Sequence, residues 1–172
     1  MTIIKSEETV AAPTRWSVDR DESSVTFAVK TFWGLSTVHG RFDRFGGSYE
    51  VGPDGTQIEL TIDADSLDTG NRTRDKHLQS ADFFAGAEHP QVRFTSTRVR
   101  DAGDGKLHVE GDLEAAGRVV PLEFDATVEQ VDDGLEVEAS TTVDQQQLGM
   151  SSGQLGMIRR PATLNVKAQL SR

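Results

Sequence analysis

Residues 106–143 read KLHVEGDLEAAGRVVPLEFDATVEQVDDGLEVEASTTV, and apolar and polar residues alternate along most of this stretch. The alternation stops at two short turn sequences, AAGR at 115–118 and DDG at 132–134. Alternation with a period of two is typical of a strand with one buried face, and Asp-Gly pairs favour hairpin turns. The stretch therefore predicts three consecutive antiparallel strands joined by short turns.

The same alternation recurs on both sides of this stretch. It predicts five more strands, around Val25–Val29, Val38–Phe42, Ile58–Ala64, Val92–Ser96 and Leu164–Leu170. Clean one-sided alternation indicates an antiparallel sheet, and closing such a sheet into a barrel removes its exposed edges. We expect an all-β fold, an extended eight-stranded antiparallel barrel, with a two-sheet sandwich as the alternative. Gly46 and Gly47 in RFGGSY are placed where a strand bends or bulges.

Composition limits the functions that the chain can have. Its 172 residues suit one domain, and we expect a flexible leader at 1–13 and a single domain at 14–172. A net charge of −10 argues against a nucleic-acid partner, and the lack of cysteine excludes disulfides and thiolate sites. No apolar run suits a signal peptide or a membrane span, so we expect a soluble, cytoplasmic protein with no integral membrane association.

Two segments, 65–90 and 145–162, interrupt the alternation. The first predicts one or two short helices, one of them from about Thr73 to Gln79, followed by a turn with Phe83 and Phe84. Connections of this length in a compact domain are usually functional or disordered, and the bulky apolar side chains argue against disorder. We expect both segments to fold over one end or one side of the barrel.

Motifs of catalysis and metal binding give no convincing match. GMSSG at 149–153 resembles a nucleophile elbow at Ser151, but that motif requires an α/β sheet and a later histidine, and the last histidine is His108. The histidines lack metal-ligand spacing, so we expect no metal, no cofactor and no enzymatic activity. The inward-facing phenylalanines form either an ordinary core or the wall of a pocket, because alternation indicates a dry face without showing whether the interior is full.

The chain resembles the YceI family of lipocalin-like proteins associated with polyisoprenoid binding. The resemblance lies in WSVDRDESSVTFAVKTFWGLSTVHGRF near the start, SLDTGNRTRDKHLQSADFFAGAEHPQVRFTST in the middle, VEGDLEAAGRVVPLEF, and LGMSSGQLGMIRRPATLNVKAQL at the end. It runs from about Trp16 to Leu170. The chain departs from the family pattern at VKTFWG and at QQQLGM, where family members often carry a histidine and an acidic-aromatic-glycine pattern.

The resemblance implies a barrel that binds or carries an amphiphilic lipid (a polyisoprenoid, an isoprenoid quinone or a fatty-acid-like molecule), and a homodimer. On this basis the candidate ligand-binding residues are Phe27, Phe32, Phe42, Phe45, Leu60, Ile62, His77, Leu78, Phe83, Phe84, Phe94 and Leu148. Candidates for contact with the polar head group are Arg72, Arg74 and Lys76. For Arg74 and Asp75 we favour the alternative that they hold the helix against the barrel.

Two other functions stay open. The first is a scaffold or stress-response interaction protein whose barrel is filled by its own side chains. The second is a lipid-modifying enzyme using His77 and Asp75 as an acid–base pair. Adjacent helical positions 75 and 77 do not face each other, which disfavours the enzyme.

Overall fold

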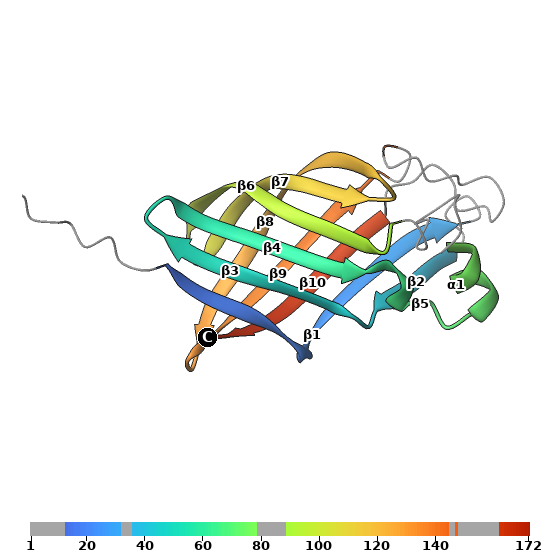
Figure 1. The fold of residues 1–172 in the computed structure, drawn as a ribbon, viewed down its shortest axis with the longest axis horizontal. Helices are drawn as coiled ribbons and strands as arrows, with labels where there is room; N and C mark the ends of the chain where they lie inside the picture. The colour runs from blue at the N-terminus through green and yellow to red at the C-terminus, as the bar shows by residue number, and fades with distance from the viewer. Residues whose placement is uncertain (1–12, 32–35, 79–88, 145–146, 148–161) are drawn as a thin grey trace, which may run out of the picture.

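The computed structural model of the chain describes residues 13–31, 36–78, 89–144, 147 and 162–172 (Figure 1). The expected leader therefore lies, except for Pro13, outside the described residues. The strands are β1 (Thr14–Thr31), β2 (Ser36–Phe42), β3 (Phe45–Gly52), β4 (Gly55–Asp63), β5 (Leu67–Asp68), β6 (Gln91–Gly103), β7 (Lys106–Ala115), β8 (Arg118–Val131), β9 (Gly134–Val143) and β10 (Ala162–Ser171). A 3-10 helix, η2 (Ala64–Ser66), and one α-helix, α1 (Arg72–Leu78), complete the described elements.

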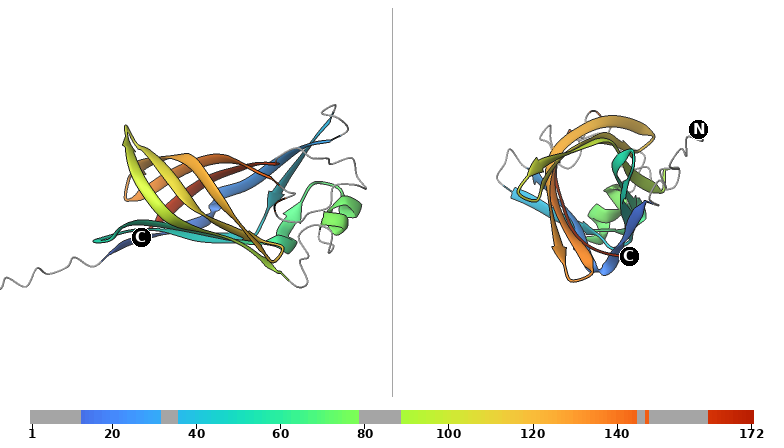
Figure 2. Two further views of the ribbon diagram at one scale, coloured as in Figure 1. Left: turned by 90° about the horizontal axis from the view of Figure 1, so that it is seen from above. Right: turned by 90° about the vertical axis from the view of Figure 1, so that its left-hand side faces the viewer.

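The strands form one antiparallel sheet that closes on itself. Their order is β10-β9-β8-β7-β6-β4-β3-β1-β2-β5, and β10 pairs back onto β1. β1 pairs with β3 through its first residues and with β2 through its last, so β2 and β3 together fill one position in the barrel. β4 and β5 fill another, because β4 pairs with β3 and β5 with β2. Viewed end-on, the strands make a ring (Figure 2), and the predicted eight-stranded antiparallel barrel is confirmed.

The first strand is longer than its predicted centre at 25–29. Its early residues Thr14, Trp16 and Val18 are partly buried and alternate with exposed neighbours, as in a strand with one inner face. The pairing with β10 shifts register between Asp19 and Ser24. This irregularity in a polar stretch interrupts the period of two, which is why the alternation alone does not show one continuous strand.

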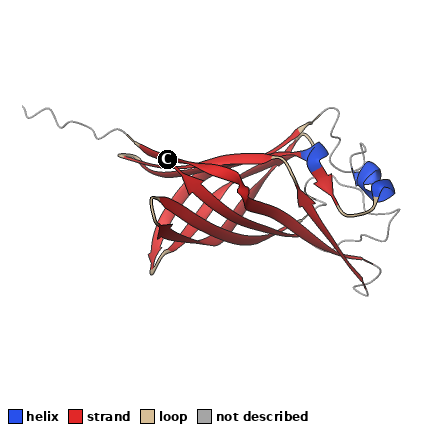
Figure 3. Ribbon diagram, turned by 90° about the horizontal axis from the view of Figure 1, so that it is seen from below, coloured by secondary structure: helices blue, strands red, loops and turns tan. Residues whose placement is uncertain are grey.

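Two positions in the barrel wall are each filled by two strands, β2 with β3 and β4 with β5. Both pairs of strands bend at the same place in the barrel. Asp43 and Arg44 separate β2 from β3, and η2 separates β4 from β5. The backbone bonds across the bend, because the Asp63 nitrogen donates to the Arg44 oxygen at 2.9 Å and the Asp43 nitrogen donates to the Ser66 oxygen at 3.2 Å. The bend carries the chain towards α1, and Figure 3 shows η2 and α1 at the same end of the barrel.

The helix prediction for the 65–90 segment is confirmed by α1, which begins and ends one residue before the predicted bounds. The predicted turn with Phe83 and Phe84 lies outside the described residues. No helix in the described part of the chain has the length and apolar character needed to cross a membrane.

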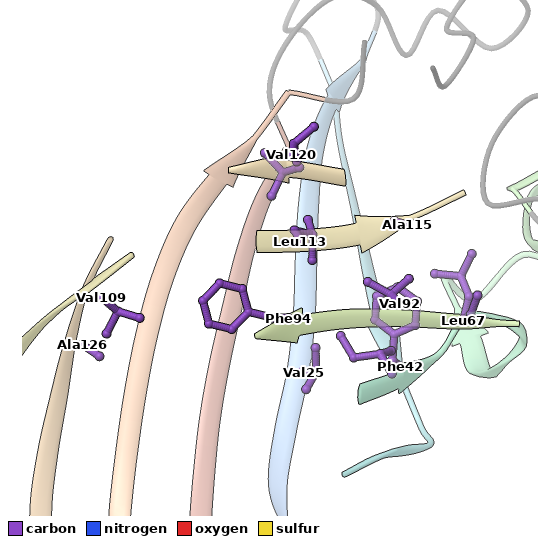
Figure 4. Close-up of a cluster of buried hydrophobic side chains, with 13 residues drawn as sticks. Val25, Phe42, Leu67, Val92, Phe94, Val109, Leu113, Ala115, Val120 and Ala126 are labelled. Carbon is purple, nitrogen blue, oxygen red and sulfur yellow. The ribbon is translucent and has the colours of Figure 1, made fainter. Parts of the chain in front are cut away.

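Two hydrophobic clusters occupy the interior. The larger cluster includes Val25, Phe42, Ile62, Phe94 and Val109, and the smaller one is built on Tyr49, Leu135, Ala168 and Leu170. Figure 4 shows Val25, Val92, Phe94 and Leu113 projecting into the interior from β1, β6 and β7. The alternation of the sequence therefore corresponds to inner and outer faces of the barrel wall.

Candidate functional site

A small apolar cavity lies inside the barrel. It is lined from six strands by Leu60, Ile62, Val92, Phe94, Leu113, Leu122, Phe124, Ala139, Thr141, Leu164 and Val166. Thr141 is the one polar residue among them. The cavity volume is about 50 Å³, and a water-sized group needs on the order of 10–15 Å³. The space exceeds that minimum, but its apolar lining offers a water too few hydrogen-bond partners, so the cavity is small and dry.

Two phenylalanine rings set the shape of this lumen. Phe94 on β6 and Phe124 on β8 have ring centroids 5.4 Å apart and planes tilted by 53°. Gly111 lies on β7 between these two strands, opposite Ser96 and Leu122. A Cβ on Gly111 would fall 2.6 Å from Cζ of Phe94, which no real structure tolerates. The glycine therefore allows the Phe94 ring to lie back against the wall.

β1 begins and β10 ends away from α1 (Figure 1), and residues from these parts of the two strands belong to the smaller hydrophobic cluster. Trp16 and Tyr49 meet edge to face, with ring centroids 5.9 Å apart. Leu135 and Leu170 are buried beside them, and the Arg172 guanidinium carbon lies 5.4 Å from the Trp16 ring centroid. Burial raises the pKa of the Tyr49 phenol. We call this group the barrel floor.

At the other end, α1 is attached to the barrel through Thr69. The Asp75 carboxylate accepts hydrogen bonds from the Thr69 nitrogen at 2.9 Å and from its hydroxyl at 2.5 Å. Arg74 donates from Nε to the Thr69 hydroxyl and from Nη2 to the Thr69 carbonyl oxygen, both at 2.8 Å. Asn71 Oδ1 accepts a bond from the Arg74 nitrogen. These contacts agree with the structural role that we favour for Arg74 and Asp75.

The other two basic residues of α1 are placed differently. Arg72 and Lys76 are exposed, and no ion pair to either is found among the described residues. They carry positive charge at the α1 end of a chain whose net charge is −10. Of the three head-group candidates, these two are exposed and Arg74 is half-buried.

The structure distributes the predicted ligand-binding residues over three settings. Leu60, Ile62 and Phe94 line the cavity. Phe42 is buried in the larger cluster, and Phe27 and Phe45 pack against that cluster. His77 and Leu78 belong to α1, although their side chains are outside the described part, as are Phe32, Phe83, Phe84 and Leu148 in full.

Most of the residues that line the cavity were not predicted from the sequence as ligand-binding residues. Eight lining residues were not among the candidates: Val92, Leu113, Leu122, Phe124, Ala139, Thr141, Leu164 and Val166. The signal was available, because all eight occupy inward positions of strands that the alternation predicts. The candidates follow the phenylalanines, most of which lie in the first half of the chain, whereas these eight residues all lie in the second half.

A second group of side chains lies on the outer face of β7 and β8. His108 Nε2 is 2.6 Å from Glu123 Oε1, and His108 Nδ1 is 2.8 Å from Asp125 Oδ1. Hydrogen bonds to Asp125 and Glu123 raise the pKa of the imidazole. His108, Glu110 and Glu123 also offer ligand atoms within 4.8 Å of one another. Sequence spacing did not reveal this group because cross-strand pairing assembles it, and a protonated imidazole between carboxylates accounts for its geometry.

Two broader hollows, lined mainly by apolar surface, also open to solvent. One, of about 630 Å³, lies over β1, β2 and β10 and is bordered by Arg41, Asp68 and Thr69. The other, of about 480 Å³, includes Lys106, Glu138 and Lys167. Both are much larger than the interior cavity.

The model of the YceI-like domain family matches residues 16–170, nearly the whole barrel. This chain belongs to the YceI family. Protein YceI of Escherichia coli O157:H7 is 37% identical over 120 residues, which cover 68% of this chain and 62% of that protein. A UPF0312 protein of Vibrio cholerae serotype O1 is 36% identical over 107 residues, covering 60% of this chain and 56% of that one. The chain thus spans less than two thirds of the length of these YceI relatives.

Solved structures share the YceI barrel. Burkholderia cenocepacia BcnA superposes with a TM-score of 0.81 at 20% identity, covering 90% of this chain and 99% of BcnA. A polyisoprenoid binding domain from Saccharophagus degradans gives a TM-score of 0.75 at 16% identity, covering 91% and 97% of the two chains. At these identities the likeness is one of fold.

Proposed function

We propose that this YceI-family protein binds an amphiphilic lipid, with the apolar tail inside the barrel and the polar end near α1. The observation that carries the proposal is the lining of the interior cavity, in which ten of eleven residues are apolar. A dry cavity of this kind suits a hydrocarbon chain, because a polar guest would lose its hydrogen bonds to water without replacement. Membership of a family whose solved relatives include a polyisoprenoid binding domain supports the same class of ligand.

The tail and the head group both contribute to such binding. Transfer of one CH₂ from water is worth about 0.8 kcal/mol, but ligands of this size retain only about 0.3 kcal/mol per heavy atom. A tail of roughly 16 carbons then supplies about 5 kcal/mol. One charged contact adds about 1–3 kcal/mol, which gives a dissociation constant in the micromolar range. The contact with the head group therefore decides whether the dissociation constant reaches the micromolar range.

An anionic head group fits the α1 end best. Arg72 and Lys76 are exposed there, whereas Arg74 is bonded to Thr69. In a chain with a net charge of −10, these two cations, which have no ion pair within the described residues, give a local attraction for a carboxylate or phosphate. The proposal thus names Arg72 and Lys76 as the head-group residues and assigns Arg74 to the support of the helix.

Binding without catalysis is the better match to the site. The described cavity lining includes no titratable side chain, so it offers no acid or base to a bound tail. The acid–base pair of the enzyme alternative needs the Asp75 carboxylate, which already accepts two hydrogen bonds from Thr69. The homodimer and the cytoplasmic location stay predictions.

A second candidate function is the scaffold with a filled barrel. The observation that favours it is the cavity volume of about 50 Å³, which is small for a lipid carrier. The two functions differ in whether the interior admits a guest at all.

The deciding experiment is native mass spectrometry of the protein purified from cells, followed by organic extraction. We expect an added mass that extracts as a lipid, and the same spectrum reads the oligomeric state. Ala139→Leu fills the cavity from β9 and is expected to abolish the added mass, whereas Thr142→Leu on the outer face of the same strand keeps it. A clean protein mass, with no thermal shift on adding lipids, would move the assignment to the filled-barrel scaffold.

A further inference from the structure

The outer face of β7 and β8 gathers four side chains that can bind a cation. Val109 has an exposed fraction of 0%, so its neighbours His108 and Glu110 lie on the opposite, outer face of β7. Pairing with β8 places Glu123 opposite Glu110 and Asp125 opposite the histidine. One imidazole and three carboxylates therefore share a patch of the barrel wall, outside the apolar cavity.

Three of these side chains can reach one ion. His108, Glu110 and Glu123 each offer a ligand atom, and the three atoms lie within 4.8 Å of one another. Two ligand atoms of a tetrahedral Zn²⁺ site are about 3.4 Å apart, because each bond is about 2.0–2.2 Å long. Glu123 is exposed and Glu110 is half-buried, so small rotations of their side chains adjust the three atoms to that spacing while the strands stay in place.

Asp125 orients the imidazole for such a role. A histidine that binds a metal through one ring nitrogen almost always donates the N–H of the other nitrogen to a carboxylate, a carbonyl or water. His108 Nδ1 lies 2.8 Å from Asp125 Oδ1, and this bond directs Nε2 towards Glu123, whose Oε1 is 2.6 Å away. When Nε2 carries a proton, that proton bonds Glu123, and an ion that binds Nε2 takes the place of the proton.

We propose that His108, Glu110 and Glu123 bind a divalent transition-metal ion of the Zn²⁺ class, and that Asp125 is the positioning residue for the imidazole. A nitrogen ligand favours Zn²⁺ and its neighbours over Mg²⁺ and Ca²⁺, which take oxygen ligands. The bound ion links β7 to β8 on the outside of the barrel. This inference is independent of the proposed lipid binding. It departs from the expectation of no metal, because cross-strand pairing and not sequence spacing assembles the ligands.

Cations beside the patch limit its affinity for a metal ion. On β6, Arg98 pairs with Glu110 and Arg100 pairs with His108. No ion pair joins either arginine to the carboxylates of the patch within the described part of the chain. Their positive charge repels a bound cation, so we expect Arg100→Gln to tighten the binding of Zn²⁺.

The test is a titration of the untagged, full-length protein with Zn²⁺, at a pH where the imidazole is neutral. NMR of the imidazole C–H signals, assigned with His108→Gln, separates His108 from the other three histidines of the chain. We expect the His108 signals to respond at the lowest Zn²⁺ concentrations, and Mg²⁺ at the same concentrations to leave them unchanged. Isothermal titration calorimetry gives the dissociation constant.

Variants identify the ligands and the positioning residue. We expect Glu110→Gln to weaken Zn²⁺ binding by at least about tenfold, and Asp125→Asn by about tenfold or more. In Asp125→Asn the ring nitrogen shifts of His108 should also lose the preference for a proton on Nδ1. Glu129→Gln is the matched control, because it removes the same charge from an exposed position of β8. We expect it to change the constant by less than about threefold, because an exposed charge at this distance is screened.

Each outcome supports or overturns part of the inference. Unchanged His108 signals with Zn²⁺ in molar excess overturn the site. Equal weakening by Glu110→Gln and Glu129→Gln also overturns it, since the effect is then a general attraction between charges. Unweakened binding by Asp125→Asn, with unchanged ring nitrogen shifts, overturns the positioning role of Asp125. Circular dichroism checks that each variant folds, and should one not fold, the His108 signals of the unmodified protein still decide whether the site exists.

Discussion

Asp75 is bonded twice to Thr69, six residues before it, through the backbone nitrogen and the hydroxyl of the threonine. This pair joins the start of α1 to the end of β5. Hydrogen bonds to a charged group are worth about 1.5–3 kcal/mol, and partial exposure reduces that value. For Asp75→Ala we expect the free energy of local opening of α1 to fall by about 1–2 kcal/mol.

Hydrogen exchange measures this effect directly. The amides of residues 74–76 should exchange about tenfold or more faster in Asp75→Ala than in the unmodified protein. Lys76→Ala is the matched control on the same helix and should change exchange little. Equal protection in the Asp75 variant would show that other contacts hold the helix.

Gly40 and Phe27 form a second close approach of a ring to a glycine. They pair across β1 and β2, and the atoms that a Cβ at Gly40 would meet all belong to the Phe27 ring. We expect Gly40→Ala to lower the free energy of unfolding by about 1–3 kcal/mol through overpacking.

A double-mutant cycle tests that cause. Combined with Phe27→Leu, Gly40→Ala should be nearly neutral, because the smaller side chain leaves room for the new methyl group. Denaturant unfolding of the four proteins gives the coupling energy. Additive losses would place the strain in the backbone of Gly40 rather than in the ring.

The bend beside η2 contains both an exposed ion-pair network and a buried hydroxyl, so their contributions to stability can be compared. Arg44 contacts Asp63 at 3.2 Å and Asp65 at 2.6 Å, and all three side chains are exposed or partly exposed. Ser66 has an exposed fraction of 6%, and its hydroxyl donates to the Asp63 carbonyl oxygen at 2.7 Å. We expect Ser66→Ala to reduce stability by about 1–2 kcal/mol and Arg44→Ala by less than about 1 kcal/mol.

Added salt distinguishes the effects of these two substitutions. Adding salt should weaken the effect of Arg44→Ala, because exposed ion pairs are screened, and leave that of Ser66→Ala unchanged. A larger loss from Arg44→Ala at high salt would mean that the network is less solvated than its exposure indicates.

His108 makes stability depend on pH in a defined direction. Hydrogen bonds to Asp125 and Glu123 raise its pKa above the usual value of about 6.5. A group whose pKa is higher in the folded than in the unfolded protein stabilises the fold fully below the unfolded value. That contribution is lost as the pH rises above about 6.5 and through the raised pKa.

NMR titration of the imidazole should therefore give a midpoint above about 6.5. His108→Gln should remove the loss of stability in that pH range while keeping the strands paired. A midpoint at or below the usual value would show that the carboxylates do not hold the proton on this histidine.

The exposed cations of α1 lead to a prediction about head groups. Replacing Arg72 and Lys76 together by glutamate should weaken binding of a fatty acid by about tenfold and leave binding of the matching alcohol unchanged. Arg98→Glu combined with Arg100→Glu, at two exposed positions of β6, makes the same change in net charge and is the control. Equal weakening by the control would make the effect a general repulsion rather than a contact at α1.

Much of the fold could be predicted from local pattern. Strand pairing in an antiparallel barrel places residues of period two on one face, so the inner positions from Val25 to Leu170 follow directly from alternation. The Asp132-Asp133-Gly134 sequence predicted a hairpin that the structure confirms, and the helix predicted from about Thr73 to Gln79 is α1, at Arg72–Leu78. The continuous β1 was not apparent, because its register shifts in a polar stretch.

The candidate site is formed by contacts between side chains from different strands. By itself the sequence determined which residues face inward, the family, and the basic character of α1, since these depend on residue order and type alone. Only the tertiary structure decided that Phe94 lies against Gly111, that Arg74 and Asp75 both bond Thr69, and that the lumen is narrow. The volume of an interior depends on how rings from separate strands pack against one another, and alternation along one strand contains no measure of that distance.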